Sequence, residues 1–115
     1  MAVNFSLWIN PDLKDAWLKY CEKRQFVSYK VVNLFAEGFI ENKDVSFLLE
    51  LLNEKPVFRG KNTVKMSVLT DADTKEQFDA ACKECGWSSS AVLRGFMDYC
   101  VRNNCSRTKL KCFFD

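Results

Sequence analysis

The chain repeats itself. Residues 3–42 align with residues 64–103 at a constant offset of 61 positions, without a single gap. Nine of the 40 aligned positions are identical, and the apolar substitutions keep their class, as in Trp17 with Phe78 and Val32 with Leu93. Each copy of an internal sequence repeat is expected to form the same structural unit. We therefore interpret the chain as two copies of one unit.

Each copy is predicted to begin with a strand, over residues 3–9 and 64–70. In both segments mostly apolar side chains recur at every second position, which is the period of a half-buried strand. The inward face would carry Phe5, Leu7, Ile9, Met66, Val68 and Thr70. The outward face would carry Asn4, Ser6, Trp8, Lys65, Ser67 and Leu69.

Two helices are predicted to follow each strand. Asn10 before a proline, and Asp71 at the equivalent position, are helix-start residues. Gly86 predicts the end of the first helix in the second copy, where Gln25 stands in the first. The second helix should begin near Ser28 in one copy and near Ser88–Ser90 in the other, with hydroxyls suited to capping.

A lone strand of seven residues leaves its backbone donors and acceptors without partners. Pairing residues 3–9 with 64–70 as an antiparallel ribbon solves this problem within one chain. We therefore predict a mostly α fold with a two-stranded ribbon and four helices on its apolar face, an intramolecular pseudo-dimer. The single domain would comprise a first copy (3–43), a connection with a short helix (44–62), a second copy (63–104) and a basic tail (105–115).

The chain contains no histidine, which removes the commonest general base and the commonest metal ligand. A Ser-His-Asp or Cys-His arrangement cannot be built from these residues. Asp71 and Asp73 form a pair of acids, but helix starts favour acids without any catalytic role. We predict that the chain is not an enzyme and needs no cofactor.

The six cysteines allow three interpretations. Cys82 and Cys85 have the spacing of zinc ligands, and Cys100, Cys105 or Cys112 could complete such a site. The first two positions fall inside a predicted helix, however, and no second closely spaced pair follows. Redox pairing is a further alternative. We interpret the cysteines as reduced, buried apolar residues and predict no metal site.

The net charge of +2 conceals an uneven distribution. Residues 55–70 and 99–114 each carry four Lys or Arg and no acid, so the rest of the chain is acidic. Such segments either contact phosphates or are solvated surface. No apolar run approaches the roughly 20 residues that cross a bilayer, and the N-terminus lacks a charged and then apolar leader. We expect a cytoplasmic protein without a membrane partner.

The order strand, helix, turn, helix, with the segments 65–70 (KMSVLT) and 86–90 (GWSSS), resembles the ribbon-helix-helix fold of the Arc and MetJ repressors. The resemblance covers both copies, as in the tandem members of that family found in conjugative plasmids and phages. It implies that the ribbon lies in the major groove of double-stranded DNA. The base-contacting residues would be Asn4, Ser6, Trp8, Lys65, Ser67 and Leu69.

The resemblance also implies that the starts of the two second helices hold phosphates through backbone N–H groups. These positions are Val27, Ser28, Tyr29, Ser88, Ser89 and Ser90, and the basic residues Arg59 and Lys61 would add phosphate contacts.

Two functions follow as hypotheses. The first is a transcriptional repressor, or a plasmid or phage DNA accessory factor, that prefers an asymmetric site because its two strands differ. The second is a ribbon-helix-helix scaffold used to bind a protein, such as a phage-encoded inhibitor or antirepressor, which the apolar Trp8 and Leu69 motivate. A second copy of the chain or another protein stays open as a further partner.

Overall fold

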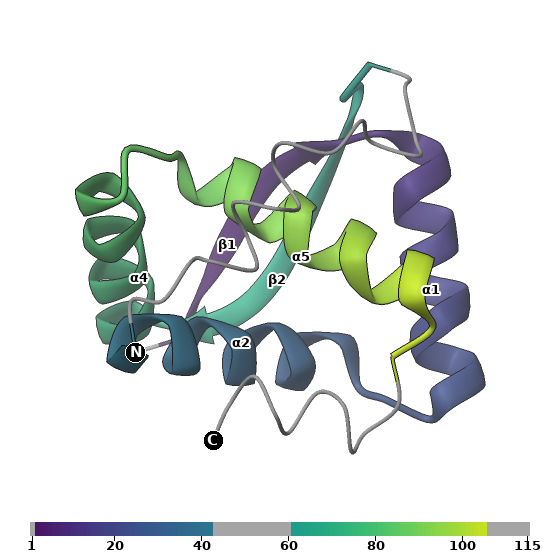
Figure 1. The fold of residues 1–115 in the computed structure, drawn as a ribbon, viewed down its shortest axis with the longest axis horizontal. Coiled ribbons are helices and arrows are strands. Elements are labelled where there is room, and N and C mark those ends of the chain that lie inside the picture. The colour runs from purple at the N-terminus through teal and green to yellow at the C-terminus, as the bar shows by residue number, and fades with distance from the viewer. Residues whose placement is uncertain (1, 43–60, 106–115) are drawn as a thin grey trace.

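The structure, a computed structural model of the chain, describes residues 2–42 and 61–105. Its element order is strand, helix, helix, repeated once (Figure 1). The first copy comprises β1 (Ala2–Ile9), α1 (Pro11–Arg24) and α2 (Ser28–Asn42). The second comprises β2 (Val64–Asp71), α4 (Ala72–Glu84) and α5 (Ser89–Asn103). The predicted strands are each one residue too short. The short helix predicted within the connection 44–62 lies outside the described residues, apart from residues 61 and 62, which are not helical, and so does the tail after residue 105.

The two strands pair antiparallel and form a two-stranded ribbon, as predicted. Ser6 lies opposite Ser67 in the register, and these two residues are also equivalent in the repeat. The pseudo-twofold axis that relates the copies therefore passes between them. Figure 1 shows α1 and α4 on opposite sides of the ribbon, as this symmetry requires. The mostly α fold with a shared ribbon is thus confirmed, and it is consistent with a tandem ribbon-helix-helix arrangement.

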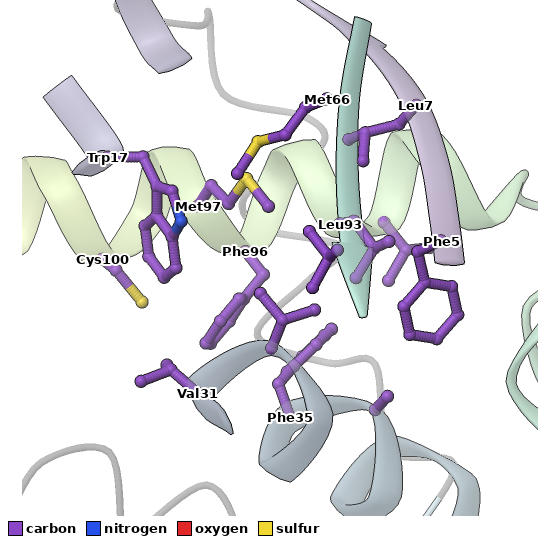
Figure 2. Close-up of a cluster of buried hydrophobic side chains, with 14 of the residues drawn as sticks. Phe5, Leu7, Trp17, Val31, Phe35, Met66, Leu93, Phe96, Met97 and Cys100 are labelled. Carbon is purple, nitrogen blue, oxygen red and sulfur yellow. The ribbon is translucent and has the colours of Figure 1, made fainter. Parts of the chain in front are cut away.

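The core lies between the ribbon and the helices (Figure 2). Its centre is a stacked pair of rings, Phe35 and Phe96, whose centroids lie 4.1 Å apart with 11° between their planes. These two residues are repeat equivalents, so the stack lies on the pseudo-twofold axis below the pair of serines. All six inward strand residues predicted from the alternation are buried: Phe5, Leu7, Ile9, Met66, Val68 and Thr70.

Contacts between the copies close the core. Trp17 of α1 meets Phe96 of α5 edge-on at 6.0 Å between ring centroids. The equivalent contact, between Phe78 of α4 and Phe35 of α2, has a separation of 6.2 Å. Trp17 and Phe78 are both fully buried. Each copy therefore inserts a fully buried aromatic side chain of its first helix against the second helix of the other copy, and neither copy has a complete core alone.

The helix ends follow the sequence signals. The side chain of Asn10 accepts a hydrogen bond from the amide of Asp12 at 2.7 Å, and Asp71 caps α4 in the same way from the amide of Asp73 at 3.1 Å. This hydrogen bond lowers the pKa of Asp71. Gly86 has a φ of +81°, and its repeat equivalent Gln25 has a φ of +58°. The predicted end of α4 at a glycine is confirmed, and Gln25 adopts the same left-handed conformation without being a glycine.

Within residues 2–42 and 61–105, the helices are too short or too polar to span a bilayer.

We expect Phe96→Ala to lower the free energy of unfolding by about 3–5 kcal/mol, because it removes a fully buried ring that stacks on its symmetry equivalent. Urea titrations followed by circular dichroism would measure the loss. Trp8→Ala is the matched control, since Trp8 is also aromatic but 57% exposed, and it should cost less than about 1 kcal/mol. Equal losses for the two variants would contradict the described core.

Candidate nucleic-acid interface on the ribbon

All six residues predicted for the outward face of the ribbon are exposed. The register sets them in three cross-strand pairs: Asn4 with Leu69, Ser6 with Ser67, and Trp8 with Lys65. Side chains directly opposite on one face of an antiparallel pair are neighbours. The six residues therefore form one continuous surface, which we call the ribbon face. It consists of Asn4, Ser6, Trp8, Lys65, Ser67 and Leu69.

The three pairs give the ribbon face different chemistry at its two ends. The central serines can donate or accept hydrogen bonds. At one end Lys65 supplies a charge beside the indole ring of Trp8, whereas at the other end the amide of Asn4 lies beside the apolar Leu69. The pseudo-twofold symmetry of the backbone is thus not matched by the side chains of this surface.

The two predicted phosphate-holding helix starts differ from each other. Ser88 caps α5, because its hydroxyl accepts a hydrogen bond from the amide of Ala91 at 3.2 Å. The prediction that Ser28 caps α2 is wrong. Ser28 is already the first helical residue, and its hydroxyl accepts a hydrogen bond from the indole N–H of Trp17 at 2.9 Å. The residue before the helix is the exposed Val27, whose side chain offers no hydrogen bond.

The remaining predicted phosphate contacts stay predictions. Ser89 and Ser90 are half-buried in the first turn of α5, and Tyr29 is exposed in the first turn of α2. Lys61 is exposed shortly before β2. Arg59 lies outside the described residues.

Two side chains that the sequence analysis did not single out hold the ribbon to the helices. Asn33 on α2 donates a hydrogen bond to the backbone carbonyl of Leu69 at 2.8 Å, and Arg94 on α5 donates one to the carbonyl of Trp8 at 2.9 Å. Asn33 and Arg94 are repeat equivalents, and so are the two carbonyls. Partial burial lowers the pKa of Arg94. The sequence contained one indication of this role, because both α2 and α5 carry a polar residue at the same repeat position, next to predicted core residues.

Asn33 has a further partner on the strand. The hydroxyl of Thr70, a buried side chain, donates to the amide oxygen of Asn33 at 2.6 Å. The amide nitrogen of Asn33 also donates to the carbonyl of Tyr29 on its own helix at 2.6 Å. Both ends of the Asn33 amide are therefore used, and they fix the position of the strand end that carries Leu69.

Two open grooves flank this end of the ribbon face. One has a volume of about 530 Å³ and lies between α2 and the end of β2, with Leu34, Tyr29 and Leu69 among its lining residues. The other has a volume of about 490 Å³, and its lining includes Lys14, Leu18 and Val27. Tyr29 and Leu69 line both grooves, so the two form one connected, mainly apolar surface beside the ribbon face.

The charge of this part of the chain is balanced. Residues 2–42 and 61–105 contain eleven Lys or Arg and eleven Asp or Glu. The net charge of +2 therefore comes from the remaining residues. Of the ribbon face itself, Lys65 is the charged member, and Lys14 and Lys30 lie in the adjoining grooves.

The cysteines at the helix interfaces are buried thiols. Burial raises the pKa of Cys21 to about 11 and that of Cys82 to about 12, and it raises the pKa of Cys100 as well. These thiols are protonated at neutral pH and pack as small apolar groups, as predicted. Within the described residues, acidic and cysteine side chains do not gather in groups of three that could hold a metal ion.

Comparison of the chain with protein-family models, curated proteins and solved structures gives no match.

We expect Asn33→Leu to lower the free energy of unfolding by about 1–3 kcal/mol, because it leaves the buried Thr70 hydroxyl and two carbonyls without this partner. In the double variant with Thr70→Val the two losses should not add, with a coupling of about 0.5 kcal/mol or more. Urea denaturation of the four proteins measures the coupling. Asn103→Leu is the matched control, since Asn103 is exposed and bonds the carbonyl of Tyr99 on its own helix. Additive losses for Asn33 and Thr70 would contradict the described contact.

Proposed function

We propose that the chain is a tandem ribbon-helix-helix protein that binds double-stranded DNA through the ribbon face, as a transcriptional repressor or a plasmid or phage DNA accessory factor. The observation that carries this proposal is the ordered, exposed set of six side chains around the pseudo-twofold axis. A two-stranded ribbon fits the major groove, and side chains on its outer face can reach base edges. The topology and the single-chain pairing of the strands support the family, since the fold needs both copies to form one ribbon.

Each ribbon-face residue has a role in this proposal. Lys65 would donate hydrogen bonds to guanine, and Asn4 would pair with adenine. Ser6 and Ser67, at the centre, would form hydrogen bonds with any of several bases and so contribute little selectivity. Leu69 would contact a thymine methyl group, and Trp8 would pack against the groove beside Lys65. Because the two ends of the ribbon face differ, the DNA site would be asymmetric rather than a perfect palindrome.

The starts of α2 and α5 would hold the flanking phosphates through backbone N–H groups, aided by the helix dipoles. The α5 start is the more polar of the two because three serines surround it. The α2 start offers Val27 and Tyr29 instead. This difference again favours binding in one orientation along the duplex.

Fluorescence-polarisation titrations against random and selected duplexes test the proposal. Phosphate contacts make non-specific binding strongest at low salt, so we expect binding at about 50 mM salt that weakens as salt rises. Selection from a random duplex pool should return a non-palindromic site. Absence of binding at about 50 mM salt would contradict the DNA-binding function.

Lys65→Ala should weaken binding to the selected site by about 1–3 kcal/mol if Lys65 contacts a base. Equal weakening on all sequences, with a salt slope lower by about one, would make Lys65 a phosphate contact. Lys83→Ala removes the same charge from an exposed residue in the last turn of α4, outside the ribbon face, and should leave the preference for the selected site over other sequences unchanged. Unchanged binding in the Lys65 variant would exclude Lys65 from the interface.

Protein binding is the second candidate, because the surface beside the ribbon face is apolar in the first copy. Leu18, Val27, Tyr29 and Leu34 are each between 41% and 49% exposed. Their repeat equivalents are polar or small: Asp79, Ser88, Ser90 and Gly95. A scaffold that binds a protein would use this surface, and it would show no affinity for DNA in the low-salt titration.

A further inference from the structure

Helix α2 carries one continuous exposed stripe along its length, and Tyr29 in its first turn is exposed as well. The stripe begins at Val27, just before the helix, and continues with Lys30, Leu34, Glu37 and Glu41 at intervals of three and four residues. We call these five residues the α2 stripe. Residues at this spacing lie on one side of a helix. Leu34, at its middle, is 49% exposed, so a large apolar side chain lies in solvent between charged neighbours.

The corresponding side of α5 is largely covered, apart from the exposed Ser88 just before the helix. The repeat equivalents of Lys30, Leu34, Glu37 and Glu41 are Ala91, Gly95, Asp98 and Arg102, which are buried or half-buried. Asp98 and Arg102 form an ion pair within α5 at 2.8 Å. The stripe with its central leucine is therefore a property of the first copy and not a consequence of the repeated fold.

The charges of one α2 stripe are complementary to those of a second α2 stripe that runs antiparallel to it. If two α2 helices cross antiparallel at Leu34, each residue before Leu34 meets one after Leu34 on the partner. Lys30 then lies between Glu37 and Glu41 of the second chain, and the same contact occurs twice by symmetry. Within the described residues, Lys30, Glu37 and Glu41 take part in no ion pair of their own chain.

The apolar part of the stripe adds a central contact. The two Leu34 side chains would meet each other at the crossing and cover the groove of about 530 Å³ that Leu34 lines together with Tyr29 and Leu69. Helices that pack through rows of side chains four residues apart cross at about −50°, which restricts the contact to the residues near Leu34. The surface is therefore small for a protein interface, and the association should be weak and sensitive to salt.

We propose that the α2 stripe is a self-association surface, through which two chains form a symmetric dimer with Leu34 at its centre and Lys30 paired with the acids of the other chain. One partner chain covers the whole α2 stripe, and α5 has no equivalent surface. Assembly therefore stops at two chains, since an interface of this kind closes on itself. The proposal does not depend on DNA binding.

Charge reversal in separate chains tests the pairing. Sedimentation equilibrium of the full-length chain should show a monomer–dimer equilibrium that shifts toward the monomer as salt rises. Lys30→Glu should raise the dissociation constant about tenfold, because both symmetric pairs become repulsive. Glu37→Lys should do the same. An equimolar mixture of the two variants should associate again, because both contacts are attractive in the mixed dimer.

Lys83→Glu is the matched control, since it makes the same charge change on an exposed residue of α4 and should leave the dissociation constant unchanged. Leu34→Asp should abolish the dimer while circular dichroism stays that of the parent. A wild-type chain that stays monomeric up to millimolar concentration would overturn the proposal. Failure of the mixture to associate better than either variant alone would also overturn it.

Discussion

The pairing of β1 with β2 is the interaction on which the rest of the structure depends. A single strand of eight residues would leave its backbone hydrogen bonds unmade, and each copy supplies only one strand. Once the strands pair with Ser6 opposite Ser67, the alternation of side chains assigns every inward residue to the core. The same register sets the pseudo-twofold axis, below which Phe35 and Phe96 stack. A shift by one residue would turn the buried phenylalanine and leucine side chains to the solvent.

The core obeys the pseudo-twofold symmetry, whereas the surface departs from it. Trp17 and Phe78 make equivalent contacts in the interior, and Asn33 and Arg94 make equivalent contacts to the ribbon through different chemistry. On the outside, serines at the start of α5 correspond to Val27 and Tyr29 at the start of α2. Two copies within one chain can diverge in this way, which two identical chains cannot. The asymmetry of the proposed DNA site would depend on these differences.

The fold could be predicted from the sequence because the repeat and the strand alternation each restrict it strongly. The offset of 61 fixed the number of units, and the period of two assigned Phe5, Leu7, Met66 and Val68 to the inner face. The capping of α2 by Ser28 was predicted wrongly, since a serine near a helix start can serve either the helix or a neighbour. Here the Ser28 hydroxyl accepts a hydrogen bond from the indole N–H of Trp17, eleven residues away in the sequence. The hydrogen bonds of Asn33 and Arg94 depend on a helix meeting a strand of the other copy, which no local pattern reports.

The ribbon face was predicted residue by residue, but its ligand depends on chemistry that exposure alone does not define. The described part of the chain carries balanced charge, so attraction to DNA would rest on Lys65, the neighbouring lysines and the helix starts rather than on a large basic surface. The apolar residues beside the face belong to one copy. They make the two ends of the surface different, so that it could bind an asymmetric DNA site or a protein partner in one orientation.

Mapping of amide chemical shifts during titration with duplex DNA tests the central claim most directly. If the ribbon face binds DNA, the largest shifts occur at Asn4, Ser6, Trp8, Lys65, Ser67 and Leu69 and at the starts of α2 and α5. Shifts confined to other surfaces, or no shifts at low salt, would contradict the account.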